Sequence, residues 1–293
     1  MVQQSERESI VSEPELIKIG MSDCRNSLFE RLINIQKKNG SEEFIHMLFK
    51  QGRMHPEISS FSNEIFYEKK LKPIPLKHQL EILHCPSYDK SDGLQNLIAS
   101  HRLAFIVSKG DKNPISDKTN KDEAIRISAL LKTIYTINKN NFNPQTVGVI
   151  VPYRNQIALI RKEIKQLNIP ALSDITIDTV ERYQGSERDF IIYGFTVQKI
   201  YQLEFLTGNV FKDNGQIIDR KLNVVLTRAR KQLFLIGNPQ ILSYNAIFQK
   251  LIKFIDNRQG VCDIPTEYFI QGKFSCSPAD KTSVPDSRQK LNV

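Results

Sequence analysis

The segment from Asp219 to Asn238, DRKLNVVLTRARKQLFLIGN, joins two apolar runs through a pair of closely spaced arginines. The second run, Leu233 to Gly237, ends in Gly-Asn and is typical of a strand in an α/β domain. Arg228 and Arg230 stand between the runs. Guanidinium groups stay charged and bind phosphate oxygens bidentately, so the pair suits the phosphates of a nucleotide or a nucleic acid. A solvated basic helix end has the same pattern, and the neighbouring segments must decide between the two.

The composition indicates a globular, basic protein. The 293 residues are 40% hydrophobic and 25% charged, which fits one large or two ordinary domains and excludes a disordered chain. Lys and Arg outnumber Asp and Glu by 41 to 32, for a net charge of +9. This balance favours a polyanionic partner.

Cysteine, histidine and apolar patterns exclude several functional classes. The 4 cysteines and 5 histidines are scattered, without C-x-x-C or H-E-x-x-H spacing, so neither a metal site nor a disulfide framework is predicted. No apolar run reaches the roughly 18 residues of a membrane span, and the charged N-terminus does not resemble a signal peptide. We therefore expect a cytoplasmic protein without a membrane partner.

Apolar runs predict an α/β fold. Five runs have the length and composition of buried strands, at residues 103–107, 147–151, 175–178, 190–197 and 233–237. Strands without polar alternation, separated by helices, indicate a parallel sheet covered on both faces. The predicted helices start near Ser27, Pro56, Asn120, Tyr153 and Ile247. Residues 44–49 are predicted to form a short strand, and residues 67–100 a loop.

A polar segment, TVERYQGSERD, runs from Thr179 to Asp189 between two predicted strands. A loop after a parallel strand lies at the carboxyl edge of the sheet, where α/β proteins bind ligands. Gln184-Gly185 would let the backbone approach a ligand, and Glu187 and Asp189 could accept from ribose hydroxyls or orient a cation. A polar surface turn has the same composition, so both interpretations stay open.

Four motifs together are more specific. QGRMHP at residues 51–56, VGVIVPYRNQ at 147–156, TVERYQGSERDFII at 179–192 and RKLNVVLTRAR at 220–230 occur in that order. This set resembles the carboxyl-terminal half of superfamily 1 helicases, in the group of the nonsense-mediated-decay helicase and the nuclease-helicase of Okazaki-fragment processing. The resemblance covers residues 20–258. It implies an α/β fold with a RecA-like parallel sheet and helices on both faces, the second domain of a P-loop NTPase helicase without the half that carries the P-loop.

The resemblance implies a nucleotide site for ATP with Mg²⁺. Arg53 and Arg228 are similar to the arginines that contact the γ-phosphate. Glu187 is similar to the glutamate near the nucleotide sugar, and Gln184-Gly185 to the turn that couples the nucleotide to the nucleic-acid strand.

The resemblance also implies contacts with single-stranded DNA or RNA. The positions that match contacts to the nucleic-acid backbone are Tyr153, Arg154 and Thr179. The expected contacts are to the nucleic-acid backbone, and no base-reading module is visible. The amino-acid sequence therefore does not distinguish DNA from RNA.

The chain departs from the family pattern at two places. Many relatives have a tyrosine at the position of Gly52, which puts base stacking there in doubt. There is also no G-x-x-x-x-G-K-[ST] motif, so the phosphate loop and the metal ligands are expected in an N-terminal RecA-like half. Asp122-Glu123-Ala124 is similar to the acidic motif of these motors, but it follows polar residues and is interpreted as a helix start, in which Glu123 completes a capping box with Asn120.

These features predict three regions. Residues 1–66 are expected to hold the trailing part of the first RecA-like domain and an inter-domain segment, residues 67–258 the second RecA-like domain, and residues 259–293 a basic disordered tail. Val2-Gln3-Gln4 resembles the family sequence after its third motif, so we expect a fragment that needs an N-terminal half.

Three functions fit the sequence. The leading hypothesis is the carboxyl-terminal motor domain of an ATP-dependent helicase, inactive as an ATPase until it is paired with an N-terminal half. The alternative is a non-catalytic module that binds single strands, which the missing P-loop favours. The third is an interaction scaffold with vestigial motifs, and the retained Arg53, Arg228 and Glu187 argue against it.

Overall fold

The computed structural model describes residues 10–24, 27–83, 88–89, 92–111, 114, 116–207, 210–213 and 216–271. The chain divides into two compact units, Met1–Phe49 and Lys50–Val293. No helix in these described ranges is long and apolar enough to cross a membrane.

The first unit is small and helical. It contains α2 (Pro14–Lys18), α3 (Leu28–Lys38) and η1 (Glu42–Phe44). Ser27 starts α3 as predicted, because its hydroxyl accepts from the Glu30 N–H at 3.2 Å while Glu30 bonds back to the Ser27 N–H at 2.9 Å. The strand predicted at residues 44–49 is wrong, since Phe44 ends η1 and residues 45–49 are irregular up to β1 (Lys50–Gln51).

The second unit is built on a parallel sheet of six strands in the order β10-β3-β9-β6-β4-β5. The strands are β3 (Leu103–Val107), β4 (Val147–Val151), β5 (Thr176–Thr179), β6 (Arg188–Gly194), β9 (Ala229–Gly237) and β10 (Val261–Cys262). The α/β fold with a parallel sheet is therefore confirmed, and β3 and β4 have the predicted bounds. Two small ladders join β1 to β2 (Lys72–Pro73) and β7 (Val210–Asp213) to β8 (Gln216–Asp219).

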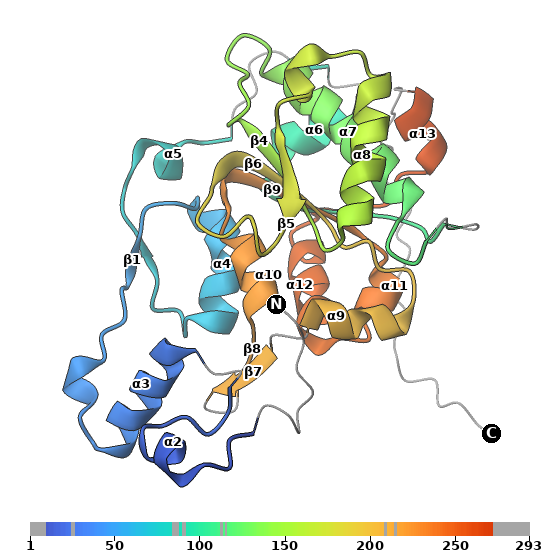
Figure 1. Ribbon diagram of the computed structural model, residues 1–293. Helices are drawn as coiled ribbons and strands as arrows, with labels where there is room; N and C mark the ends of the chain where they lie inside the picture. Colours follow the sequence, from blue (N-terminus) through green and yellow to red (C-terminus); the bar gives the residue numbers. More distant parts are fainter. Residues whose placement is uncertain are drawn as a thin grey trace. The chain divides into compact units, whose positions relative to one another are not determined.

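Successive strand residues point to opposite sides of the sheet, and both sides are apolar. Helices therefore cover both faces. Leu233 and Leu235 belong to one apolar core and Phe234 and Ile236 to the other. Figure 1 shows the first face covered by α4 (Pro56–Phe66), α10 (Arg220–Leu226) and α12 (Ala246–Asp256), and the second by α6 (Gly93–Ser100), α7 (Lys121–Ile137) and α8 (Arg154–Gln166). The remaining helices are α5 (Lys77–Leu80), η2 (Pro170–Leu172), η3 (Ile200–Gln202), α9 (Leu203–Thr207), α11 (Pro239–Leu242) and α13 (Thr266–Gln271).

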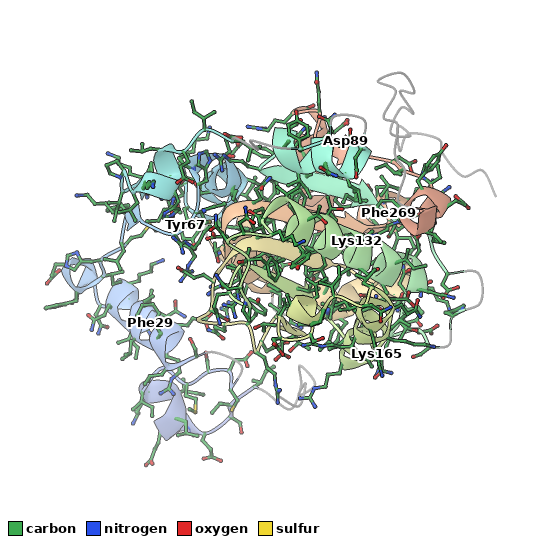
Figure 2. The ribbon with its side chains drawn as sticks, turned by 90° about the horizontal axis from the view of Figure 1, so that it is seen from above. Phe29, Tyr67, Asp89, Lys132, Lys165 and Phe269 are labelled. Atoms are coloured by element: carbon green, nitrogen blue, oxygen red, sulfur yellow. The ribbon has the colours of Figure 1, made fainter. Side chains whose placement is uncertain are left out.

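The region after residue 258 differs from the disordered tail that the sequence predicts. β10 pairs with β3, and α13 packs on α7 through Arg126, whose side chain is fully buried. The Arg126 guanidinium donates to the Ile264 carbonyl at 2.7 Å and lies 4.5 Å from the centre of the Phe269 ring. Figure 2 shows Phe269 beside α7, the helix that carries Lys132. Residues 272–293 lie outside the described ranges.

The start of α7 is only partly as predicted. The Asn120 side chain accepts from the Glu123 N–H at 3.1 Å and caps the helix. The Glu123 carboxyl, however, points into the protein interior, where it accepts from the Thr196 N–H at 2.8 Å and from the Ser108 hydroxyl at 3.3 Å. The Asn120 N–H instead donates to Gln156 at 2.8 Å. Because the Glu123 side chain is fully buried, its pKa is raised to about 8.

Burial of the Glu123 carboxyl predicts that the stability of the protein depends on pH. A single substitution at this residue should remove that dependence. The folded protein keeps a proton on Glu123 up to pH about 8, whereas the unfolded chain releases it near 4.5. The contribution of protonated Glu123 to the free energy of unfolding is complete below pH 4.5 and is lost as the pH rises through 8. Glu123→Gln keeps an acceptor for Thr196 without a charge. Urea unfolding at several pH values is expected to show the variant gaining stability over the wild type from pH 6 to 9. A constant difference across this range would contradict the assignment.

Candidate functional site

The residues that the sequence singled out lie in two groups, at opposite edges of the sheet. Thr179 ends β5 at the carboxyl edge, as predicted. The chain then returns across the sheet, so that Glu187 immediately precedes β6 at the amino edge. Arg228 immediately precedes β9 at the same edge, because Arg188 and Ala229 are register partners. The sequence placed the whole segment 179–189 at the carboxyl edge, and this is wrong for its last residues. At about 3.3 Å per residue, the 7 residues of β6 separate the edges by roughly 20 Å.

The Glu187 carboxylate pairs with two guanidinium groups at the amino edge, those of Arg53 and Arg230. Arg53 Nε donates to Glu187 Oε2 at 2.6 Å, and the Arg53 guanidinium also donates to the Thr227 carbonyl at 3.2 Å. Arg230 Nε lies 3.9 Å from Glu187 Oε1. We call Arg53, Glu187, Arg228 and Arg230 the amino-edge cluster.

Arg228 is the fixed member of this cluster. Its side chain is buried, with Nε donating to the Val224 carbonyl at 3.0 Å and the terminal nitrogens to the Ser186 carbonyl at 3.3 Å and the Thr227 hydroxyl at 3.4 Å. These partners are uncharged. Burial, and then the charge of Arg53, lower the pKa of Arg228. The amino-edge cluster therefore has an excess of positive charge, which suits an anionic ligand.

A bulge in β9 adds basic groups beside the cluster. Between the pairs Arg188/Ala229 and Phe190/Gln232, β9 has one residue more than β6. Asp189 therefore faces two cations, with Arg230 at 3.6 Å and Lys231 at 3.1 Å.

The loop that carries Arg53 is held by residues that the sequence did not reveal. Gln51 Oε1 accepts from the N–H groups of Arg53 at 3.1 Å and Met54 at 2.9 Å. From α5, Gln79 donates to the Met54 carbonyl at 2.8 Å, and His78 Nε2 bonds to the Arg53 carbonyl at 2.9 Å. The sequence predicted a loop here, because α5 has only 4 residues and depends on these tertiary bonds.

The Gln184-Gly185 turn is exposed and makes no direct bond to the amino-edge cluster within the described residues. Gly185 has φ +91°, a conformation that favours glycine. Below the turn, Tyr183 is buried against β4, where a Cβ on Gly148 would lie only 1.7 Å from the Tyr183 hydroxyl. This contact fixes the segment between the two edges.

The three residues expected near nucleic acid gather at the carboxyl edge. Val151 and Thr179 are register partners at the ends of β4 and β5, and Tyr153 and Arg154 follow β4 directly. Arg154 is exposed at the first position of α8 and Thr179 is half-buried. The Tyr153 ring is buried, because Phe205 stacks on it at 4.9 Å, and burial raises the pKa of Tyr153 to about 12. The sequence analysis gave no role to Phe205.

Within the described ranges, no group of three His, Cys, Asp or Glu side chains could hold a metal ion. The amino-edge cluster offers donors to an anion instead.

Known proteins and one family model are similar to this chain over most of its length. A family model described as an AAA domain matches residues 24–240. An uncharacterised ATP-dependent helicase of Methanocaldococcus jannaschii is 29% identical over 79% of this chain. The DNA replication ATP-dependent helicase/nuclease DNA2 of Homo sapiens is 26% identical over 88%, and the regulator of nonsense transcripts 1 homolog of Drosophila melanogaster is 26% identical over 83%. The chain spans 32%, 24% and 19% of these relatives, respectively.

A solved structure was also found, the C-terminal domain of a possible DNA helicase from Lactobacillus plantarum. It is 12% identical, with a TM-score of 0.34, over 68% of this chain and 96% of that domain.

The contact between Gly148 and Tyr183 predicts a coupled pair of substitutions. Gly148→Ala would place a methyl group against the tyrosine hydroxyl and is expected to lower the free energy of unfolding by about 1–3 kcal/mol. Tyr183→Phe is expected to be neutral or stabilising, since the buried hydroxyl has no hydrogen-bond partner within the described part of the chain. The double variant should recover part of the loss, measured by urea unfolding. Strict additivity of the two effects would contradict the contact.

Proposed function

Because this chain belongs to the AAA domain family and is a helicase domain of superfamily 1, we propose that it works as the second RecA-like motor domain of an ATP-dependent helicase. The observation that supports this function most strongly is the amino-edge cluster. Three arginines from two distant motifs meet there around a single carboxylate, and one of them, Arg228, is buried with uncharged hydrogen-bond partners.

In this proposal, Arg228 and Arg53 contact the phosphates of ATP. Negative charge develops on the transferring phosphoryl group, and an arginine placed against it in advance stabilises that charge. Arg228 meets this condition because carbonyl oxygens and a hydroxyl hold its guanidinium. Glu187, which bonds to Arg53 here, would accept from the ribose hydroxyls once the phosphates take its place beside Arg53.

The remaining catalytic groups would come from a domain with a P-loop, on the same polypeptide or on another chain. The sequence contains no G-x-x-x-x-G-K-[ST] motif, and a P-loop supplies the phosphate-binding amides, the lysine and the hydroxyl for Mg²⁺. Within this proposal the metal is held by that N-terminal RecA-like half.

The carboxyl edge is proposed to bind the backbone of single-stranded DNA or RNA. Arg154 is exposed there beside Thr179, and the net charge of +9 favours a polyanion. A non-catalytic module for binding single strands is the second candidate, because this surface requires no P-loop.

ATP hydrolysis by the assembled enzyme tests the motor assignment. We expect the purified chain to be inactive alone and to show strand-stimulated ATP hydrolysis once a P-loop-bearing RecA-like domain is added. Arg228→Ala in that assembly should reduce turnover by about 10³-fold or more and leave strand affinity unchanged. Arg258→Ala, which removes an exposed arginine at the end of α12, is the matched control. Unchanged turnover in Arg228→Ala would refute its role, and strand binding without hydrolysis in the assembly would favour the binding module.

Salt dependence tests the carboxyl edge. If Arg154 neutralises one phosphate, Arg154→Ala should reduce the slope of log affinity against log salt by about 0.7 for a single strand. Lys132→Ala, an exposed cation on α7, should leave the slope unchanged. Fluorescence anisotropy with a labelled oligonucleotide at several salt concentrations measures both. An equal decrease in both variants would show that the effect reflects net charge and not a contact.

A further inference from the structure

Arg230 belongs to the amino-edge cluster, but the proposed function gives its side chain no task. Arg230 Nε lies 3.9 Å from Glu187 Oε1, and Arg230 Nη1 lies 3.6 Å from Asp189 Oδ1. Neither distance is short enough for a hydrogen bond. The side chain is 38% exposed, so its guanidinium group can turn toward either carboxylate. Arg230 is therefore a cation that lies close to two anions and is tightly bonded to neither.

The main chain of Arg230, in contrast, is fixed. Arg230 and Lys231 lie in the bulge of β9, where both stand opposite Asp189. The Arg230 carbonyl accepts from the His55 N–H at 2.9 Å. His55 follows Arg53 by two residues, so this bond joins the bulge to the loop that carries Arg53. The bulge therefore places the Arg230 side chain beside the carboxylate that holds Arg53.

Glu187 presents one carboxylate oxygen to each of two arginines. Oε2 accepts from Arg53 Nε at 2.6 Å, and Oε1 faces Arg230 Nε at 3.9 Å. The side chains of Arg53 and Glu187 are 33% and 43% exposed, so solvent screens the bond between them. A movement of about 1 Å would bring Arg230 Nε within hydrogen-bonding distance of Oε1. The carboxylate can thus exchange one arginine for the other with little rearrangement.

The other cations of this edge are already engaged. The Arg228 guanidinium donates to two carbonyl groups and a hydroxyl. Lys231 Nζ lies 3.1 Å from Asp189 Oδ2, which is closer than Arg230 comes to this carboxylate. Asp189 therefore keeps a partner if Arg230 turns away from it. Arg230 is the cation that remains for Glu187 once phosphates have bound.

We propose that Glu187 changes its partner from Arg53 to Arg230 when the phosphates of a nucleotide bind to Arg53. This inference rests on the proposed function, to which it adds Arg230 as a positioning residue. In the exchange, Glu187 Oε2 is released and becomes available to the ribose hydroxyls, while Arg230 holds the carboxylate through Oε1. Without Arg230, the displaced carboxylate would stay unpaired beside the incoming phosphates and repel them.

The test measures the binding of inorganic tripolyphosphate to the purified full chain by isothermal titration calorimetry at low salt. Arg230→Ala is expected to weaken binding about 2- to 10-fold, because binding then leaves Glu187 without a partner. Arg230→Lys keeps the charge and should retain most of the affinity. Both variants should keep the loop in place, since His55 bonds to the Arg230 carbonyl and not to its side chain.

Lys231→Ala is the matched control for net charge. Lys231 is 34% exposed and neighbours Arg230 on β9, but it pairs with Asp189 and not with Glu187. Its substitution removes the same charge from the same edge without removing the new partner of Glu187. We expect Lys231→Ala to weaken the binding of tripolyphosphate less than Arg230→Ala does.

Glu187→Gln separates a role through Glu187 from a direct contact to phosphate. In this background no carboxylate competes for Arg53, so tripolyphosphate should bind more tightly than to the wild type. Arg230→Ala should then weaken binding no more than Lys231→Ala does in the same background. The loss caused by Arg230→Ala should thus depend on the carboxylate of Glu187.

The outcomes distinguish this inference from the function on which it rests. An equal loss from Arg230→Ala in the wild-type and Glu187→Gln backgrounds would overturn the exchange of partners and keep the phosphate site. Equal losses from Arg230→Ala and Lys231→Ala in the wild type would do the same. Undiminished binding to Arg228→Ala would instead contradict the phosphate contact of the proposed function, and a wild-type chain that binds no tripolyphosphate would overturn both.

Discussion

The parallel pairing of β6 with β9 is the constraint on which the candidate site depends. Its register places Arg188 beside Ala229 at the amino end and Gly194 beside Ile236 at the carboxyl end. Since both strands run the same way, the residues that precede them meet at one edge, which is how Glu187 and Arg228 come together. A slip of one residue would turn every side chain of β9 to the other face and remove both cores at once, so the cores and the cluster are specified by the same register.

The segment from Thr179 to Glu187 physically connects the two edges. It begins beside the residues proposed to contact nucleic acid and ends in the amino-edge cluster, and between them Tyr183 is buried against Gly148. The segment therefore joins the two edges through one packed stretch, because its middle is held against the sheet by Tyr183 and its ends lie at the two edges.

The sequence predicted what depends on local pattern and missed what depends on tertiary bonds. β3 and β4 have the predicted bounds because they are uninterrupted apolar runs, and Asn120 caps α7 as its spacing indicates. Motif order singled out Arg53, Glu187 and Arg228 as candidates, but it did not predict the edge at which they meet, since a loop's composition does not show how far it returns across a sheet. Other features escaped prediction because distant residues fix them: α5 through Gln79, α13 through Arg126, and η3 through the bond from Gln202 to the Asp117 carbonyl.

The two proposed phosphate contacts differ in how they are held, and this difference matters for a motor. Arg53 is bound to Glu187 near the surface, and exposed ion pairs contribute only about 0–1 kcal/mol, so an incoming polyphosphate can displace this carboxylate at little cost. Arg228 is buried against carbonyl groups that come from the preceding helix α10 and from the segment before β6, and moving it would break both of these hydrogen bonds. An anion at this edge would therefore meet one arginine whose position is already set and one that becomes free as it binds. The fixed guanidinium suits stabilisation of developing charge, and the exchangeable one suits sensing whether the phosphates are present.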